Sequence, residues 1–185
     1  MKENTDMRQA ASGDAAQIQR HARHAQLLRR QGKYRASVAE WREALKLAPA
    51  DRELKRELAI SVFLTQDYKG ILPELQRMLK ADGQSANLNF FVGDSLLETA
   101  HPDEAVPYLE RALKLDRNML PAHVALGLCY VHLQKPRQAI PHLKAGLSLD
   151  TNGSLYYELA RAYRATGQAA LAKQAMEKYQ ALSHH

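Results

Sequence analysis

Apolar residues recur along this chain with a period of 34 residues. Three columns of apolar side chains keep this spacing over four successive units. The columns are Val38, Leu72, Val106 and Ile140; Trp41, Leu75, Leu109 and Leu143; and Leu45, Leu79, Leu113 and Leu147. A fixed period of about 20 to 50 residues is typical of stacked units, none of which can bury its apolar face alone. The pattern therefore predicts one continuous stack.

Each unit contains two helical patterns, and no long stretch alternates apolar and polar residues as a strand does. The predicted N-caps are Asp14, Asp51, Ser85 and Asp103. Pro121 fits the first turn of a helix, where its missing N–H costs little. The prolines that recur at the repeat spacing should shift a helix start rather than break the helix. These prolines are Pro73, Pro107 and Pro141.

The repeat also sets the expected domain organisation. Residues 1–13 are polar and have no periodic face, so we expect a frayed N-terminal segment. Residues 14–183 are expected to form a single repeat domain. Its five units are predicted at about 18–51, 52–85, 86–119, 120–152 and 153–183.

Small residues recur within the units as regularly as the large ones. The first helices carry Ala59, Gly93, Gly127 and Ala160, and the second helices carry Ala105, Ala139 and Ala172. The fourth unit reads His123-x2-Leu126-Gly127-x2-Tyr130 and then Ala139-x3-Leu143. This order resembles the tetratricopeptide repeat, W-x2-L-G-x2-Y followed by A-x3-F. The resemblance covers about residues 18–182 and implies an all-α, right-handed α-solenoid of about five antiparallel helix pairs.

A second face of the first helices is apolar in the middle three units, where exposure to solvent would favour polar residues. In the family that the chain resembles, this face lines the concave side of the superhelix. A contiguous exposed apolar surface usually marks an interaction site. The predicted groove residues are Ile60, Phe63, Phe90, Asp94, Leu97, Val124, Leu128 and Val131. The predicted groove ends are Arg56, Tyr157, Arg161 and Arg164.

These features predict a non-catalytic adaptor or scaffold whose groove binds a protein or peptide, as an amphipathic helix or an extended apolar segment. Some family members grip a terminal carboxylate with Lys and Asn, and those residues are absent from the equivalent positions. Two alternatives remain. The apolar face could join copies of the chain into a homo-oligomer, or the chain's own N-terminal segment or last helix could fill the groove.

The formal net charge of +6 is concentrated at one end of the chain. Residues 1–56 contain 13 Lys and Arg against 7 Asp and Glu, whereas residues 57–185 contain 13 of each. The basic residues singled out are Arg20, Arg23, Arg29 and Arg30. They form either a polar cap on the first repeat or a docking end for an acidic partner or surface. No aromatic residues alternate with them, so nucleic acid is not an expected partner.

Other reactive groups give no catalytic pattern. His21 and His24 have a helical i, i+3 spacing that could hold a metal, but no acidic ligand is near in sequence. Asp94 and Glu98 form an i, i+4 carboxylate pair that could share a proton, hold a cation or contact a basic partner residue. Cys129, the single cysteine, is expected to be buried. We expect no metal, no cofactor and no enzymatic activity.

The chain has no apolar run long enough to cross a membrane and no visible signal peptide. We expect a soluble protein. This is compatible with the cytoplasm, or with the periplasm if a leader was removed from a longer precursor.

Overall fold

The computed structural model describes residues 2–183, with side chains from residue 13 onward. The chain divides into two compact units, residues 1–67 (unit 1) and 68–185 (unit 2), and each is described by itself. All regular secondary structure in the described part of the chain is helical, which confirms the all-α prediction. None of the described helices combines the length and the apolar character that a membrane span requires.

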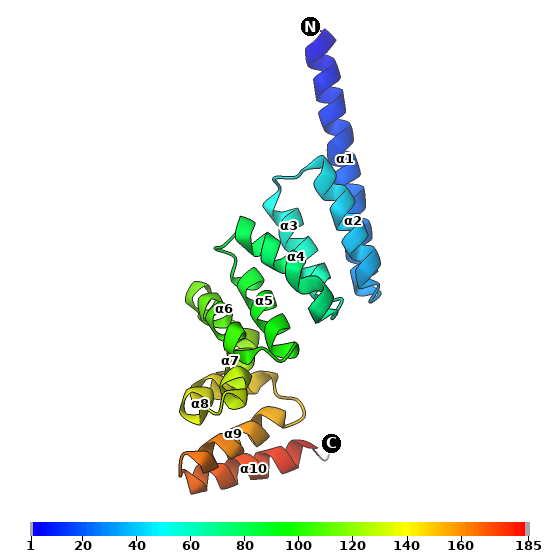
Figure 1. Ribbon diagram of the computed structural model, residues 1–185. Helices are drawn as coiled ribbons and strands as arrows, with labels where there is room; N and C mark the ends of the chain where they lie inside the picture. Colours follow the sequence, from blue (N-terminus) through cyan, green and yellow to red (C-terminus); the bar gives the residue numbers. More distant parts are fainter. Residues whose placement is uncertain (1, 184–185) are drawn as a thin grey trace. The chain divides into compact units, whose positions relative to one another are not determined.

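Unit 1 contains three helices, α1 (Lys2–Arg30), α2 (Tyr34–Leu47) and α3 (Arg52–Phe63). α2 packs against both of the others (Figure 1). Asp51 is confirmed as the N-cap of α3, where its Oδ1 accepts hydrogen bonds from the backbone N–H groups of Glu53 and Leu54. Asp14 lies within α1, so its prediction as an N-cap is wrong. The frayed segment predicted at 1–13 falls almost wholly on residues without described side chains, and it stays a prediction.

A chain of hydrogen bonds joins the three helices inside unit 1. The indole N–H of Trp41 donates to Ser61 Oγ at 3.0 Å, and Ser61 Oγ lies 3.2 Å from Ser37 Oγ. The hydroxyl of Ser37 donates to the backbone carbonyl of Ala25 on α1 at 2.8 Å. All four residues are buried. Since a buried polar group without a partner is costly, this network supports the packing of α1, α2 and α3.

Unit 2 contains seven α-helices and one turn of 3₁₀ helix in its described residues. They are α4 (Tyr68–Ala81), α5 (Ala86–Glu98), α6 (Pro102–Leu115), α7 (Leu120–His132), α8 (Pro136–Ala145), η1 (Leu147–Leu149), α9 (Ser154–Ala165) and α10 (Ala169–Ser183). α5 packs on α6, α7 on α8, and α9 on α10, and α7 also contacts both α5 and α9 (Figure 1). The first helices of these three pairs therefore lie next to one another.

Helix starts in unit 2 agree only partly with the sequence signals. Ser85 is confirmed as the N-cap of α5, because its Oγ accepts from Leu88 N at 3.2 Å. Pro121 stands in the first turn of α7, as predicted. Asp103 is not an N-cap, because α6 begins one residue earlier and His101 occupies the cap position.

The recurring prolines do not shift the helix starts, so that part of the prediction is wrong, whereas the expectation that they do not break the helices is confirmed. α4, α6 and α8 each begin five residues before their proline and continue through it. The three prolines, Pro73, Pro107 and Pro141, are all exposed. The carbonyl group that loses its helical donor is therefore open to water, which reduces the cost of an internal proline.

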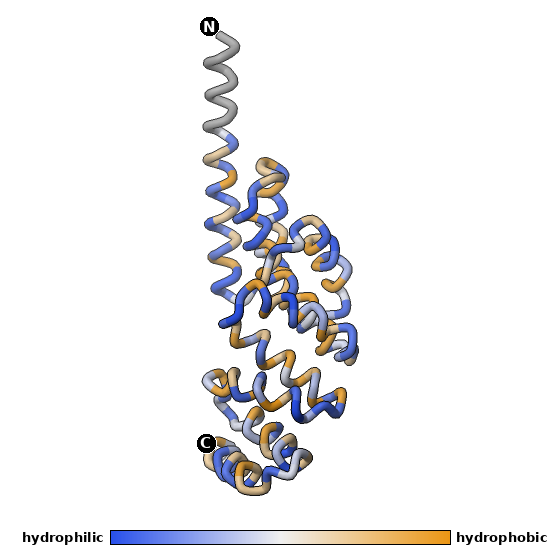
Figure 2. Tube along the Cα trace, turned by 90° about the vertical axis from the view of Figure 1, so that its left-hand side faces the viewer, coloured by the Kyte–Doolittle hydropathy of each residue, from blue (hydrophilic) through white to orange (hydrophobic). Residues whose placement is uncertain are grey.

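The core of unit 2 follows the predicted columns. Leu75, Leu109 and Leu143 have no exposed surface. Gly127 provides the close approach between α7 and α8, because a Cβ atom there would lie 2.9 Å from Leu143 Cδ2. Hydrophilic and hydrophobic residues are interspersed along the helices of both units (Figure 2).

α8 departs from the repeat in one respect. It has 10 residues, whereas α2, α4 and α6 have 14 each. Gly146 follows it at a point of very close packing, because a Cβ atom there would lie 2.3 Å from Val124 Cγ2 on α7. The chain then forms η1 and the segment 150–153 before α9 begins at Ser154. Residues 149–152 thereby become part of the site described next.

Candidate functional site

The first helices of unit 2 border a cavity of about 680 Å³. α5, α7 and α9 supply most of its wall, and the segment 149–152 and α10 complete it. The lining residues are Phe90, Asp94, Leu97, Glu98, Pro121, Val124, Ala125, Leu128, Leu149, Asp150, Thr151, Asn152, Ser154, Leu155, Tyr157, Glu158 and Tyr179. We call this space the α5–α7–α9 cavity.

The structure brings five of the predicted groove residues and one predicted groove end together around this cavity. The groove residues are Phe90, Asp94, Leu97, Val124 and Leu128, and the groove end is Tyr157. The remaining predicted positions lie elsewhere. Val131, Arg161 and Arg164 border a second cavity of unit 2, whereas Ile60 and Phe63 are half-buried and Arg56 is exposed on α3 in unit 1. The role of all these residues in binding a partner stays a prediction.

The wall of the α5–α7–α9 cavity includes apolar and aromatic surface that is open to solvent. Leu149 is 47% exposed and Tyr157 is 40% exposed. They are two of the four large hydrophobic side chains that are exposed among the residues with described side chains. The ring of Tyr157 lies 5.3 Å from that of Tyr179, between centroids, and Phe90 is half-buried. Such a surface gains stability when another apolar group covers it.

Two carboxylates stand one helical turn apart on α5 and border the same cavity. Burial raises the pKa of Asp94 to about 6, with a smaller contribution from the charge of Glu98. The charges of these carboxylates also affect titratable groups on two neighbouring helices, α4 and α7. The pKa of Tyr68 on α4 is raised by burial and then by Asp94 and Glu98, and the pKa of Cys129 on α7 is raised to about 12 by burial and then by Asp94.

The other two acidic residues of the cavity already have partners. Asp150 accepts a hydrogen bond from the backbone N–H of Tyr156 at 3.1 Å. Glu158 forms an ion pair with Arg161 at 3.0 Å. Within the described part of the chain, Asp94 and Glu98 form no ion pair, and the cavity lining includes no Lys or Arg. The α5–α7–α9 cavity is therefore acidic within a chain of net positive charge.

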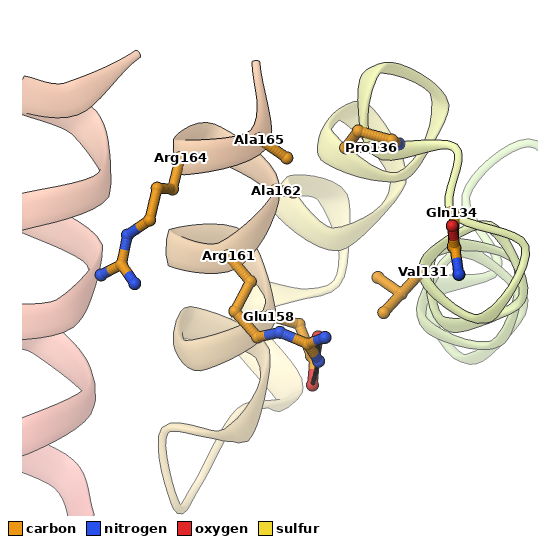
Figure 3. Close-up of a pocket in the computed structure, with 8 residues that line it drawn as sticks. All are labelled: Val131, Gln134, Pro136, Glu158, Arg161, Ala162, Arg164 and Ala165. Carbon is orange, nitrogen blue, oxygen red and sulfur yellow. Dashed lines mark hydrogen bonds and ion pairs between the residues drawn. The ribbon is translucent and has the colours of Figure 1, made fainter. Parts of the chain in front are cut away.

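A second cavity, of about 550 Å³, lies between α9 and the end of α7 with the start of α8. Val131 projects from α7 toward α9, and Arg161 lies along the near side of α9 beside Glu158 (Figure 3). Arg164 points away, toward α10 (Figure 3). The guanidinium carbon of Arg161 also lies 5.9 Å from the centre of the Tyr157 ring, which is within the range of a cation–π contact. Arg161 thus borders the second cavity and contacts two residues, Glu158 and Tyr157, that line the α5–α7–α9 cavity.

The basic residues of unit 1 are partly engaged within the unit. Arg29 forms an ion pair with Glu57 at 2.6 Å, and Arg56 pairs with Glu53 and with Glu57. The other members of the predicted basic end, Arg20, Arg23 and Arg30, are exposed. Arg29 of the predicted basic end and Arg56, a predicted groove end, therefore both pair with the buried carboxylate of Glu57.

Tertiary structure supplies an acidic partner for the His21 and His24 pair. Glu40 on α2 accepts from His21 Nδ1 at 2.6 Å and lies 3.1 Å from His24 Nδ1. The hydrogen bond from His21 is the main reason why the pKa of Glu40 is lowered. No group of three or more His, Cys, Asp and Glu in the described part of the chain is arranged to hold a metal ion.

A second histidine pair, His123 and His142, was not expected from the sequence. Their Nδ1 atoms lie 3.0 Å apart between α7 and α8, so one ring donates and the other accepts. Burial lowers the pKa of His142, and the charge of His123 adds to this effect. Nearby, the hydroxyl of Tyr130 donates to Glu110 at 2.8 Å. The two histidines are 19 residues apart, and only the packing of the helix pair shows that they meet.

Sequence reasoning also missed several residues that complete the α5–α7–α9 cavity, namely Leu149, Asp150 and Tyr179. Gly146 was the available signal for the first two. It occupies the column that holds alanine at Ala44 and Ala112, and glycine weakens a helix at that point. No signal in the repeat pattern marked Tyr179.

The described fold is a set of antiparallel helix pairs that repeats along the chain, which is the architecture of a helical-repeat protein. Three family models of the tetratricopeptide repeat match the sequence, at residues 22–86, 96–159 and 153–183. The chain belongs to the tetratricopeptide repeat family. The resemblance inferred from the motifs is thereby confirmed.

Several solved structures share this fold at low sequence identity. The crystal structure of MamA protein is 18% identical, with a TM-score of 0.72 over 92% of this chain and 93% of that chain. YrrB, described as a TPR protein with an unusual peptide-binding site, is 20% identical, with a TM-score of 0.67 over 88% of this chain and 84% of that one. PilF of Pseudomonas aeruginosa is 21% identical, with a TM-score of 0.70 over 91% of this chain and 77% of that chain. A comparison with curated proteins found no match.

Proposed function

We propose that this protein is a protein-interaction adaptor that binds a partner polypeptide in the α5–α7–α9 cavity. The observation that carries the proposal is the gathering of apolar and aromatic side chains from three neighbouring first helices around one open cavity. Helical-repeat proteins commonly use the surface formed by equivalent faces of successive repeats for binding. YrrB, which has the same fold, is described as having a peptide-binding site.

The chemistry of the cavity suits an extended or helical segment with apolar anchors. Phe90, Val124 and Leu128 are half-buried, and Leu149 and Tyr157 are exposed at the rim. Burial of apolar surface by a partner stabilises a complex by about 25 cal/mol per Å² before ordering costs are subtracted. A short peptide that covers several of these side chains can therefore bind with useful affinity without any covalent or catalytic step.

Selection of peptides from a random library tests this proposal directly. The phage-displayed library is selected on the full chain, and the affinity of one synthetic selected peptide is measured by fluorescence anisotropy. Phe90→Asp should remove binding, because it places a charge in the apolar wall. Leu149→Ser should weaken binding roughly tenfold, since truncation of one buried leucine removes about 1.5 kcal/mol or more of apolar contact.

Leu171→Ser is the matched control. Leu171 is also an exposed leucine, at 40%, but it lies on α10 and does not line the cavity. This variant should bind the peptide like the unmodified chain, and circular dichroism should remain helical for all three variants. Selected peptides that bind Phe90→Asp and Leu149→Ser at full strength would exclude the cavity as the binding site.

Self-association through the same face is the competing outcome. Light scattering over a range of concentrations separates the two. Under our proposal the mass stays that of one chain. A dimer that is dissociated by Phe90→Asp but not by Leu171→Ser would instead assign the cavity to contacts between copies of the chain.

A further inference from the structure

We propose that the α5–α7–α9 cavity selects partner segments that place a lysine or arginine side chain between apolar residues, with Asp94 and Glu98 as the counter-charges. This inference rests on the proposed function and names the chemistry of the partner.

The charge balance of the wall favours a cation. Four acidic residues line the cavity: Asp94, Glu98, Asp150 and Glu158. Asp150 is engaged at the start of α9, and Glu158 is neutralised by Arg161. Asp94 and Glu98 are left without a cationic partner in the described part of the chain, although the whole chain carries an excess of positive charge. A ligand that supplies the missing positive charge removes a repulsion already present in the free protein.

Because of its position, the carboxylate of Asp94 should attract a cation more strongly than a carboxylate on the surface would. Asp94 is half-buried and lines the cavity together with apolar residues of α5 and α7, and burial is the main cause of its raised pKa. Charges interact more strongly where water is partly excluded. Glu98, one turn further along α5, also lines the cavity and is exposed. A cationic side chain that enters the cavity therefore meets Glu98 in water and Asp94 in a drier place.

Aromatic rings provide the other contacts that a cationic side chain uses. Tyr157 and Tyr179 lie 5.3 Å apart at the α9 and α10 side of the cavity, and Phe90 lies on α5. The unit already contains one such contact, since Arg161 lies over the ring of Tyr157. The long alkyl stems of lysine and arginine also fit apolar walls while their heads reach polar groups. The cavity thus offers apolar contact for the stem and carboxylates for the head.

A double-mutant cycle between protein and peptide tests this assignment. A peptide selected on the full chain is synthesised in two forms, one with its central lysine or arginine and one with norleucine at that position. On the unmodified chain, replacement by norleucine should weaken binding by about tenfold, as expected for a partly desolvated charge pair. On the D94N/E98Q variant, the two peptides should bind within about twofold of each other.

The control variant is D103N/E104Q. It removes one Asp and one Glu from the same unit, at exposed positions in the first turn of α6 that do not line the cavity. It should keep the tenfold difference between the two peptides, which excludes a general effect of net charge. The norleucine peptide should still bind D94N/E98Q, and this binding shows that the cavity of the double variant remains folded.

The outcomes separate this inference from the proposed function. If the peptides lose affinity for Phe90→Asp but norleucine substitution has no effect, the cavity binds apolar segments and the cationic preference is wrong. The preference is also wrong if the norleucine effect is equally large on D94N/E98Q. If the peptides bind Phe90→Asp at full strength, the proposed function itself fails.

Discussion

Gly93 on α5 and Leu109 on α6 meet so closely that no side chain fits between them. A Cβ atom on Gly93 would lie 2.7 Å from Leu109 Cγ and 3.3 Å from the carbonyl oxygen of Ala105. Leu109 is fully buried, so it has little room to move. The absence of a side chain at Gly93 therefore sets the distance between the two helices of this pair.

Gly93→Ala should destabilise unit 2, although alanine is the better helix former. Overpacking costs about 1–3 kcal/mol, which outweighs a gain in helix propensity of up to about 1 kcal/mol. Urea denaturation followed by circular dichroism measures the difference. Gly83→Ala is the control, because the nearest atom to its Cβ would be Leu79 O at 3.8 Å. An unchanged or higher midpoint for Gly93→Ala would mean that Leu109 can move aside.

Two serines at the same step of successive repeats should respond oppositely to alanine. Ser61→Ala leaves the buried indole N–H of Trp41 without its acceptor, which should cost about 1–3 kcal/mol. Ser95 Oγ is buried and has no hydrogen-bond partner among the described residues, so Ser95→Ala should be neutral or stabilising. Trp41 is the only tryptophan, so its fluorescence during urea unfolding measures Ser61→Ala in unit 1, and circular dichroism during urea unfolding measures Ser95→Ala in unit 2. Equal losses in both variants would contradict the role assigned to the Trp41–Ser61 bond.

Asp94→Asn should stabilise unit 2 at neutral pH. The pKa of Asp94 is raised to about 6, so the folded state disfavours the ionised carboxylate. The resulting loss of stability is absent below the ordinary pKa of 3.8, grows as the pH rises toward about 6, and is complete above it. Asp94→Asn should therefore be more stable than the unmodified chain at neutral pH by about 1–3 kcal/mol.

The difference in stability of unit 2 between Asp94→Asn and the unmodified chain should disappear in acid. Glu98 on the same helix is present in both proteins, and Tyr68 and Cys129, whose pKa values are raised above ordinary values of 10.0 and 9.0, are neutral over this range. Hydrogen exchange of α5 measures the effect locally. A difference in stability that stays constant with pH would show that the carboxylate of Asp94 is well solvated.

Glu40→Gln should remove an acid-sensitive contribution from unit 1. The pKa of Glu40 lies below its ordinary value of 4.5, chiefly because of the hydrogen bond from His21. A lowered pKa contributes stability that is present above the ordinary pKa and is lost as the pH falls through the folded pKa. The difference in the urea midpoint of unfolding between the unmodified chain and Glu40→Gln should therefore become smaller as the pH falls below 4.5. If the urea midpoints of the two proteins change with pH in parallel, the hydrogen bond between His21 and Glu40 does not contribute to stability.

The repeat made the helical framework predictable, since burial of a large side chain such as Leu143 requires a small residue such as Gly127 on the facing helix. These paired constraints recur every 34 residues and can be read without coordinates. Local caps were less predictable. Asp103 has the right chemistry for an N-cap, but the helix begins earlier, at Pro102, where the fixed backbone angle of proline favours a first turn.

The residues of the candidate site were predictable where they lie on helices that follow the 34-residue repeat. They were not predictable where the chain departs from the repeat. Phe90, Val124 and Leu128 were found because the face of a helix follows from spacing alone. Leu149 was missed because α8 ends early, with Gly146 as its C-cap, and the chain there leaves the repeat pattern. The meeting of His123 with His142 depends on packing between helices.

Cys129 is the single cysteine of the chain, and burial raises the pKa of its thiol to about 12. We expect its sulfur to react slowly with alkylating reagents at neutral pH, because the side chain is buried and the thiolate is the reactive form. A new cysteine placed at an exposed position such as Leu149 or Leu171 would then be the main target of a maleimide dye. Fluorophores can thus be attached at chosen points for single-molecule work without first removing the native sulfhydryl.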